Sequence, residues 1–429
     1  MDSISVSNKR NTADLTDPNR RNLLNFIRER GPITRRELAG LCAFSTSTTK
    51  RLLEVLLREG LVQEQTGGAP HESVPRRGRK AQGLRLNAGF AHAVGANIEP
   101  GLLELCAVDL EGGVLAQQRC TLSEPRPEPV LALLVEEVRR LAETLRAQGR
   151  KRLLGVGVGV AGVINAREGQ VLFCPNLPAW ENFPLGERLR AQLETEILVD
   201  DGVRCMALAE KRYGLAKNLA NFLYLYLGLG VGAGIVLDNR FYRGSNGLAG
   251  EFGHITVAAD GPLCNCGNRG CLEVMASRMG ILSAVRALVA SNVYSGLAER
   301  VHSGEQLSLK DIEEAAESGD KLANMVIHGV GESIGTGVAD LVNIFDPGVV
   351  VLGGEVIERF GDHLIEGINR TVRLRGIHSI TQKTRILTSR LGAPSSPVRE
   401  TAGVFDSPAA RGAATMVLER FLGSDLLNL

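Results

Sequence analysis

Apolar residues recur at helical spacing three times near the start of the chain, and this pattern predicts three short helices. The first is expected over residues 19–30 and ends before a Gly-Pro pair. Thr34 and Glu37 have the spacing of a capping box, which opens a second helix. Ser45 is placed to cap a third helix, which Gly60 closes. The chain therefore begins with a small helical module.

The polar start of the third helix gives this module a function. Between the Ser45 cap and the first leucine every position is polar and two are cationic, as a recognition helix requires where it meets phosphates and base edges. A strand at Leu61-Val62, a wing tip over residues 67–75 and a basic return over residues 76–80 follow. The pattern predicts a winged helix-turn-helix, and a protein-interaction module with a solvated basic face is the alternative. The residues expected to contact DNA are Arg35, Arg36, Ser45, Thr46, Ser47, Thr49, Lys50, Arg51 and Arg79.

From about residue 90 the pattern changes to strands that alternate with helices, which predicts an α/β fold. The run Leu153–Ile164 is expected to be one buried strand, whose glycines let another backbone approach closely. Further strands are expected at residues 94–97, 103–108, 197–199 and 349–352, a pair around a glycine turn at 222–237, and helices at 129–148 and 203–213.

The charge distribution separates the same two parts. The 429 residues carry a formal net charge of +1, but residues 1–86 contain 16 Lys and Arg against 9 Asp and Glu, a balance of +7, which leaves −6 for the remainder. A small basic head on an acidic body indicates a module that binds a polyanion, joined to a part that does not. With 44% hydrophobic and 23% charged residues, the chain is expected to be globular, with two or three domains.

Cysteine usage and the first residues predict a cytoplasmic protein without a membrane segment. The chain opens on polar residues, and it lacks the cationic and apolar regions of a signal peptide. Eight cysteines in a chain of this length indicate no disulfide framework, and three of them lie between Cys264 and Cys271. This crowding indicates metal binding in a reducing compartment.

The segment from His254 to Cys271 offers one imidazole and three thiolates, a closed tetrahedral set of the kind that holds structural zinc. Free or disulfide-linked thiols are the alternative. Because four protein ligands leave no open position, a hydrolytic role for the metal is not expected. We expect zinc to fix the loop that carries Glu251, His254 and Glu273, two carboxylates and an imidazole that suit a polyhydroxylated ligand. The expected metal ligands are His254, Cys264, Cys266 and Cys271.

The glycines of residues 227–234 alternate and do not have the spacing of a dinucleotide fingerprint. Such alternation predicts a strand-turn-strand hairpin. The backbone N–H groups of this hairpin either face a phosphate or serve only the turn.

With its cysteine-rich segment Gly250–Glu273, the chain resembles the ROK family (repressors, open reading frames and sugar kinases), in the transcription-regulator branch of xylose and N-acetylglucosamine repressors. The similarity extends from Asn19 to about Leu422. The segments typical of the family are Gly250–Glu273, Pro175–Leu185 and Leu341–Gly354, and the head resembles the winged helix of its regulators.

The resemblance implies an actin-like, hexokinase-like pair of α/β lobes with a sugar in the cleft between them, preceded by an all-α winged helix-turn-helix domain. The DNA-binding domain is expected over residues 1–88 and the sugar-binding ROK domain over residues 89–429. Its smaller lobe is expected at about 89–200 plus the C-terminal helix, and its larger lobe at about 201–405. His254 and the three cysteines match the family's zinc ligands. The positions implied for sugar binding are Asn176, Asp201, Glu251, His254 and Glu273.

Two departures from the family's kinases predict that phosphoryl transfer is lost. The kinases open this body with an Asp-x-Gly-Gly-Thr phosphate loop, and the matching residues 97–101 here read Asn-Ile-Glu-Pro-Gly. The kinases also carry an Asn-Asp pair before the Glu that aligns with Glu210. Counting back, Asp201 falls at the Asn, and Gly202 falls at the Asp that acts as general base. Phosphoryl transfer requires a placed metal, a base and phosphate contacts, and two of these three are therefore missing.

The sequence thus favours a sugar-responsive regulator, most simply a repressor that binds an inverted-repeat DNA operator as a homodimer or homotetramer. The sugar has to bind two states of the protein with different affinities in order to shift them. The second interpretation is an ATP-dependent sugar kinase with an added DNA-binding head. The third is a body that responds to a protein regulator instead of a free sugar.

Overall fold

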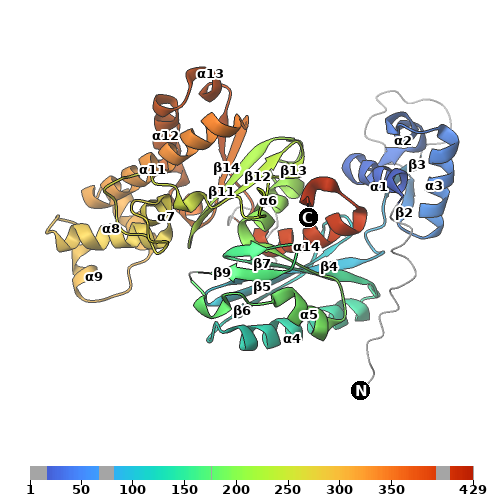
Figure 1. Ribbon diagram of the computed structural model, residues 1–429, viewed down its shortest axis with the longest axis horizontal. Helices are drawn as coiled ribbons and strands as arrows, with labels where there is room; N and C mark the ends of the chain where they lie inside the picture. Colours follow the sequence, from blue (N-terminus) through green and yellow to red (C-terminus); the bar gives the residue numbers. More distant parts are fainter. Residues whose placement is uncertain (1–16, 67–81, 175, 393–405, 429) are drawn as a thin grey trace. The chain divides into compact units, whose positions relative to one another are not determined.

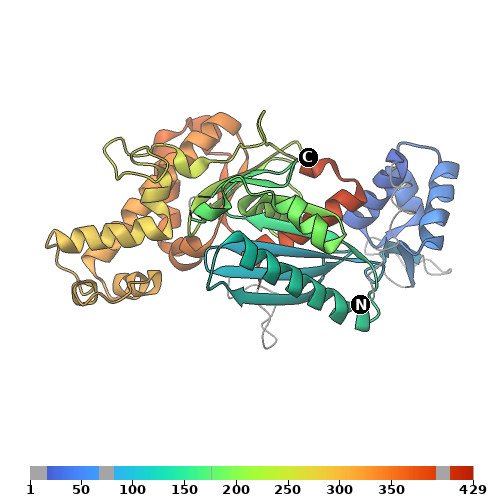
Figure 2. The same ribbon diagram turned by 60° about the horizontal axis from the view of Figure 1, so that its bottom comes forward.

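The computed structural model describes residues 17–66, 82–174, 176–392 and 406–428. Apart from the last two residues, the chain divides into a first unit of residues 1–205 with 409–427, and a second unit of residues 206–408 (Figures 1 and 2). Each unit contains a five-stranded sheet of its own.

The first unit opens with the three predicted helices, and we call residues 17–86 the head. The capping box of Thr34 and Glu37 is confirmed, and the Ser45 hydroxyl accepts the N–H of Thr48 at the start of the third helix. The described part of the wing pairs with a short strand that precedes the second helix, in the order β1-β3-β2. The head consists of α1 (Pro18–Arg30), β1 (Ile33–Thr34), α2 (Arg35–Leu41), α3 (Thr46–Arg58), β2 (Val62–Thr66) and β3 (Gln82–Leu86).

The body of the first unit is a five-stranded sheet in the order β10-β7-β4-β5-β6. Strands β4, β7 and β10 are parallel, β5 pairs antiparallel with β4, and β6 pairs antiparallel with β5. Val94, Ala96 and Ile98 of β4 join the apolar cluster that contains residues of α4 and α5, whereas Ala93 joins the cluster that contains residues of α14, because side chains alternate along a strand. The elements are β4 (His92–Glu99), β5 (Leu102–Asp109), β6 (Val114–Thr121), α4 (Pro127–Ala147), β7 (Leu153–Val160), η2 (Pro178–Trp180), α5 (Leu185–Leu193), β10 (Ile197–Asp201), α14 (Pro408–Leu422) and η4 (Asp425–Leu427).

The single strand expected over Leu153–Ile164 is wrong at its end. β7 stops at Val160, and a separate strand, β8 (Val163–Asn165), pairs with β9 (Gln170–Phe173) in a small hairpin. Gly162 at this break lies so close to the carbonyl oxygen of Phe173 that a Cβ there would be 2.6 Å from it. β7 therefore ends before Gly162, although the apolar pattern continues.

The glycines of β7 serve the close approach that the sequence predicts. A Cβ on Gly157 would lie 1.9 Å from the backbone oxygen of Ala413, and one on Gly95 of β4 would lie 1.9 Å from that of Ala410. Helix α14 therefore rests directly on the backbone of β4 and β7, at positions where only glycine leaves room.

Gly157→Ala is expected to destabilise the first unit by about 3 kcal/mol, because the added methyl group meets backbone that has little freedom to move. Urea unfolding measures this loss. Gly40→Ala on α2 is the control, since a Cβ there meets no atom within 4 Å, and it should be neutral or slightly stabilising. Equal unfolding midpoints for the two variants would contradict the close packing of α14.

The second unit has a sheet in the order β13-β12-β11-β14-β15 and a group of helices around one apolar cluster. The predicted hairpin at residues 222–237 is present as the antiparallel strands β11 and β12. Helix α6 (Gly202–Tyr213) begins in the first unit and continues into the second. The other elements of the second unit are β11 (Phe222–Leu227), β12 (Val231–Leu237), β13 (Arg240–Phe241), η3 (Phe252–His254), α7 (Leu272–Ala276), α8 (Arg278–Ala290), α9 (Ala298–His302), α10 (Leu309–Glu317), α11 (Lys321–Phe345), β14 (Val349–Gly353), α12 (Glu355–Arg375), α13 (His378–Thr381) and β15 (Arg385–Thr388).

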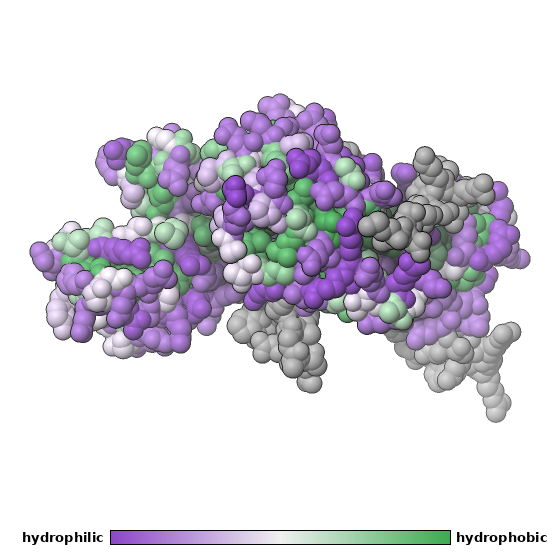
Figure 3. All heavy atoms as spheres, turned by 90° about the horizontal axis from the view of Figure 1, so that it is seen from below, coloured by the Kyte–Doolittle hydropathy of each residue, from purple (hydrophilic) through white to green (hydrophobic). Residues whose placement is uncertain are grey.

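Hydrophilic residues cover most of the face shown in Figure 3, with smaller hydrophobic areas among them. Within the described residues, no helix combines the length and the apolar character that crossing a membrane requires.

Candidate functional site

The start of α3 presents polar side chains to solvent, as a recognition helix requires. Five of the predicted DNA contacts are exposed there: Ser45, Thr46, Ser47, Lys50 and Arg51. Thr49 is the exception, with 3% of its surface exposed and its hydroxyl donating to the backbone oxygen of Ser45. The expectation for Thr49 is therefore corrected, because its side chain faces the core of the head and not the surface that could meet DNA.

Two further cations lie at the first turn of α2. Arg35 forms an ion pair with Glu64 of β2, at 2.7 Å between Nη2 and Oε1, so a carboxylate already lies beside this predicted DNA contact. Arg36 beside it is exposed. Arg79, the remaining predicted contact, lies outside the described residues.

The predicted metal ligands converge in the second unit. One ligand atom from each of the four residues lies within 4.8 Å of all the others. The Sγ atoms of Cys266 and Cys271 are 3.6 Å apart, and Cys264 Sγ is 3.7 Å from His254 Nδ1. A tetrahedron with metal–sulfur bonds of about 2.3 Å has edges of about 3.8 Å, so the donor set fits a tetrahedral metal. The cluster comprises His254, Cys264, Cys266 and Cys271.

Backbone hydrogen bonds bring the ligands together. The N–H of Cys264 donates to the backbone oxygen of Asn268 at 2.7 Å, which closes the turn between the first and last cysteine. The N–H of Val257 donates to the backbone oxygen of Gly270 at 2.9 Å. Gly270 has φ +60°, and a Cβ there would lie 1.6 Å from the backbone oxygen of Ala258. Glycine is thus required for the chain to fold back over itself at this position.

The thiols differ in their tendency to ionise. The backbone N–H of Asn268 lowers the pKa of Cys266, whereas burial raises the pKa of Cys264, and burial also raises the pKa of Cys271 to about 12. Three neighbouring thiolates therefore need a cation to be stable together, which a metal supplies.

The expected sugar-binding residues of the second unit flank this cluster. Glu251 directly precedes η3 and makes no capping hydrogen bond with its side chain, and His254 ends η3. Glu273 follows the ligand Cys271 by two residues, in the first turn of α7, and its Oε2 accepts the N–H of Val231 at 3.2 Å. The Glu273 carboxylate therefore links the segment that follows Cys271 to the β11–β12 hairpin.

The glycine hairpin uses its own N–H groups. Gly228 donates to the backbone oxygen of Gly230 at 3.0 Å, Leu229 to the hydroxyl of Tyr226 at 3.4 Å, and Val231 to Glu273. These three N–H groups therefore already have acceptors within the protein.

The two departures from the kinase pattern are neighbours in the first unit. Asn97 on β4 is buried, and a Cβ on Gly202 would lie 3.3 Å from its Oδ1. Among the described residues, Asn97 Oδ1 has no hydrogen-bond partner, while its Nδ2 donates to Glu99 at 3.0 Å. Asp201 accepts the N–H of Val203 at 3.1 Å at the start of α6. The space beside Gly202 is thus occupied by the Asn97 amide, and the Asp201 carboxylate caps the helix.

Three further polar residues, Asn176, Glu210 and Glu358, lie outside the metal cluster and the glycine hairpin. Asn176 is exposed, in the turn before η2. Glu210 on α6 is fully buried, accepts hydrogen bonds from Ser389 Oγ at 2.7 Å and the N–H of Leu215 at 2.5 Å, and has a pKa raised by burial. At the start of α12, burial and the neighbouring Glu355 raise the pKa of Glu358 to about 7.

Comparison with known protein families matches residues 98–419 to the ROK family. The chain belongs to the ROK family. Residues 16–63 match winged helix-turn-helix DNA-binding domains. The predicted family and fold class are confirmed.

Relatives and a solved structure extend this result over most of the chain. The chain is 30% identical to the xylose repressor of Caldicellulosiruptor bescii over 86% of its own length and 90% of the relative's. It is 28% identical to the N-acetylglucosamine repressor of Shigella flexneri, covering 78% of this chain and 79% of that protein. A crystal structure of a ROK family transcriptional regulator, a homologue of the E. coli MLC protein, superposes with a TM-score of 0.78 over 94% of this chain and 96% of that one, at 28% identity.

Sequence reasoning missed the partners of two site residues. It predicted Arg35 as a DNA contact but not its pairing with Glu64, since that contact depends on the packing of β2 beside α2. It predicted the glycine hairpin but not the Glu273 carboxylate beneath it. The distance along the chain between partners left no local signal for either contact.

Proposed function

We propose that this chain is a sugar-responsive DNA-binding regulator, acting as a repressor of carbohydrate-utilisation genes in the cytoplasm. The observation that carries the proposal is the presence, in one chain, of a recognition helix with an exposed polar start and a ROK body that keeps Glu251, His254 and Glu273. The full-length relatives named as xylose and N-acetylglucosamine repressors support it.

An electrophoretic mobility shift with the promoter next to the chain's own gene tests the proposal. A shift is expected at low salt, and the sugar that raises the melting temperature of the protein in a thermal-shift screen should change it. D-xylose, D-glucose and N-acetylglucosamine are the first sugars to screen. No shift at any salt concentration would contradict the DNA-binding role.

We propose zinc as the metal of the cluster formed by His254 and the three cysteines, and a structural role for it. Three thiolates and one imidazole are soft and borderline ligands that zinc prefers, and four protein ligands leave no position for substrate. When bound, zinc supplies a fixed fold for the loop. The loop's own residues then orient Glu251, His254 and Glu273 toward the hydroxyl groups of a sugar, and these three are the proposed binding residues. Asn176 and Asp201 stay predictions.

We propose that the body has no kinase activity. Gly202 carries no base, Asn97 fills the space beside it, and three N–H groups of the glycine hairpin are used internally. The Glu355 carboxylate lies at the start of α12, directly after Gly353-Gly354. A coupled ADP-release assay with hexoses, pentoses and N-acetylated sugars should show no turnover above background.

The operator is expected to be an inverted repeat, since a symmetric oligomer presents two heads related by a two-fold axis. A homodimer or homotetramer follows from this proposal, and light scattering on the purified chain measures the mass directly. Pulldown from membrane and soluble fractions tests the further proposal that a protein regulator acts on the body.

Arg51→Ala is expected to weaken DNA binding on every sequence and to lower the slope of log K against log salt by about one, because one phosphate contact is lost. Fluorescence anisotropy at several salt concentrations measures the slope. Arg58→Ala is the matched control, an exposed arginine at the other end of α3. An unchanged slope for Arg51→Ala would remove this residue from the proposed DNA contacts.

A further inference from the structure

Helix α14 joins the sheet of the first unit over most of its length. Its backbone lies on Gly95 of β4 and Gly157 of β7, as described above. At Gly412 it also meets the start of α6, where a Cβ would lie 1.8 Å from the backbone oxygen of Cys205. These are contacts between backbones, so α14 has little freedom to slide or rotate on the sheet.

The last turns of α14 contact the head. Arg28 on α1 donates to both carboxylate oxygens of Glu419, at 2.8 and 3.2 Å. The Glu419 side chain is fully buried and that of Arg28 is 12% exposed. Val417, Leu418 and Leu422 of α14 belong to the same apolar cluster as the core of the head. The head thus shares a core and a buried, bidentate ion pair with α14.

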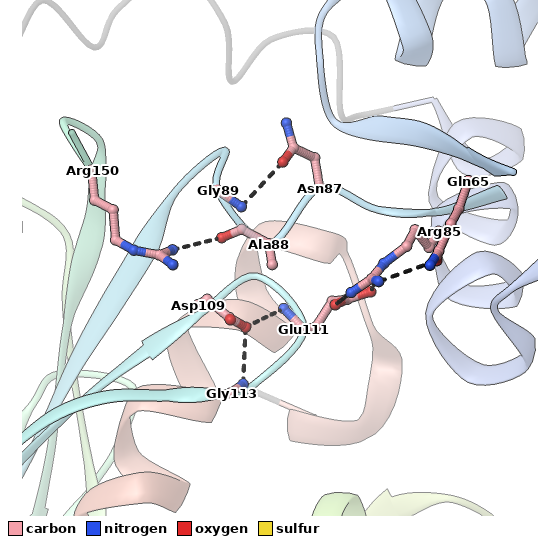
Figure 4. Close-up of polar contacts among 9 residues, drawn as sticks. All are labelled: Gln65, Arg85, Asn87, Ala88, Gly89, Asp109, Glu111, Gly113 and Arg150. Carbon is pink, nitrogen blue, oxygen red and sulfur yellow. Dashed lines mark hydrogen bonds and ion pairs between the residues drawn. The ribbon is translucent and has the colours of Figure 1, made fainter. Parts of the chain in front are cut away.

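The connection between β3 of the head and β4 is also held in place (Figure 4). Arg150 donates to the backbone oxygen of Ala88 at 3.1 Å, and the Asn87 side chain accepts the N–H of Gly89 at 3.1 Å. Arg85 at the end of the head pairs with Glu111 in the turn after β5. The short connection therefore provides little slack for a head that moves independently.

We infer that α14 holds the head in one orientation on the sheet of the first unit, with Arg28 and Glu419 as the positioning pair. Orientation matters for a dimeric reader of DNA, since two heads reach both half-sites only at the correct separation. This last step rests on the proposed DNA-binding function, whereas the positioning itself is a property of the first unit alone.

Removal of one partner from the pair is the informative change. Glu419→Gln leaves the Arg28 guanidinium buried with no opposite charge, a situation that costs far more than the pair itself contributes. Replacement of both partners, Arg28→Met with Glu419→Leu, removes the charges but keeps an apolar contact of similar size. The single variant should therefore release the head, and the double variant should hold it.

Spin labels on α3 and α4 measure the orientation directly. Because the chain has eight native cysteines, the labels are attached to p-acetylphenylalanine placed at the exposed residues Glu54 and Glu143. Pulsed electron paramagnetic resonance on the full chain, without DNA or sugar, should give a narrow distance distribution for the native residues, a broad one for Glu419→Gln and a narrow one for the double variant. Glu104→Gln, which breaks the Arg119–Glu104 pair of the same sheet, is the control and should leave the distribution narrow.

Affinity for the promoter fragment gives the second readout. Glu419→Gln should lower it by about tenfold or more, and the double variant should restore it. If Glu419→Gln does not fold, Arg28→Lys replaces it, since a lysine keeps the charge but loses the bidentate contact. A distribution for the single variant as narrow as that of the native pair, or one for the double variant as broad as that of the single, overturns the inference. The distance measurement needs no DNA, so it tests the positioning of the head even if the DNA-binding proposal fails.

Discussion

Cys271→Ser is expected to lose the bound metal and to lower the melting temperature of the protein by about 10 °C. The sulfur of Cys271 is fully buried and lies 3.6 Å from that of Cys266, so its loss opens the tetrahedral set. Loss of a structural metal belongs to the few changes that cost more than about 4 kcal/mol. For a unit of this size, each kcal/mol corresponds to about 2–4 °C.

Mass spectrometry under native conditions and a thermal melt measure the two effects. Cys120→Ser, on β6 and outside the cluster, is the control and should keep one metal per chain. A chelator should reproduce the effect of Cys271→Ser on the unchanged protein. Full metal content in Cys271→Ser would refute the ligand assignment.

Glu273→Ala is expected to lower sugar affinity by about a hundredfold, because it removes a charged hydrogen-bond acceptor from the proposed sugar site. The same change frees the N–H of Val231, so the β11–β12 turn is expected to loosen as well. Isothermal titration with the sugar selected by the thermal-shift screen measures the affinity.

Glu273→Gln separates these two effects. Its amide oxygen still accepts the N–H of Val231, but the negative charge is gone. If sugar binding depends on the carboxylate, Glu273→Gln should bind weakly and melt like the unchanged protein. Native sugar affinity in Glu273→Gln would assign Glu273 a role in holding the hairpin alone.

Local patterns predicted the head well because its signals are short in range. The Thr34–Glu37 capping box and the Ser45 cap depend on residues within one turn of helix, and both are present. The glycines of β7 were also informative, since a strand glycine indicates a close approach whatever the approaching element is. That this element is α14 could not be read, because more than two hundred residues separate the two.

Thr49 shows where local reasoning fails. Its neighbours Lys50 and Arg51 are exposed, and a polar residue between polar residues indicates a surface position. The helix rotates by about 100° per residue, however, and Thr49 falls on the same side as Leu52, Leu53 and Leu56, which form the core of the head. Its hydroxyl is satisfied by the backbone of Ser45, which removes the main cost of burying it.

The sequence by itself determined the division into a basic head and an acidic body, the family, and the four residues of the metal cluster. The first follows from composition, and the other two follow from motifs whose residues lie close together in the chain. Only the tertiary structure showed that Asn97 fills the space beside Gly202, that Glu273 lies under the glycine hairpin, and that Glu419 pairs with Arg28. The partners in these contacts lie far apart in sequence, so the contacts depend on which strands and helices pack together, and packing is a property of the folded chain as a whole.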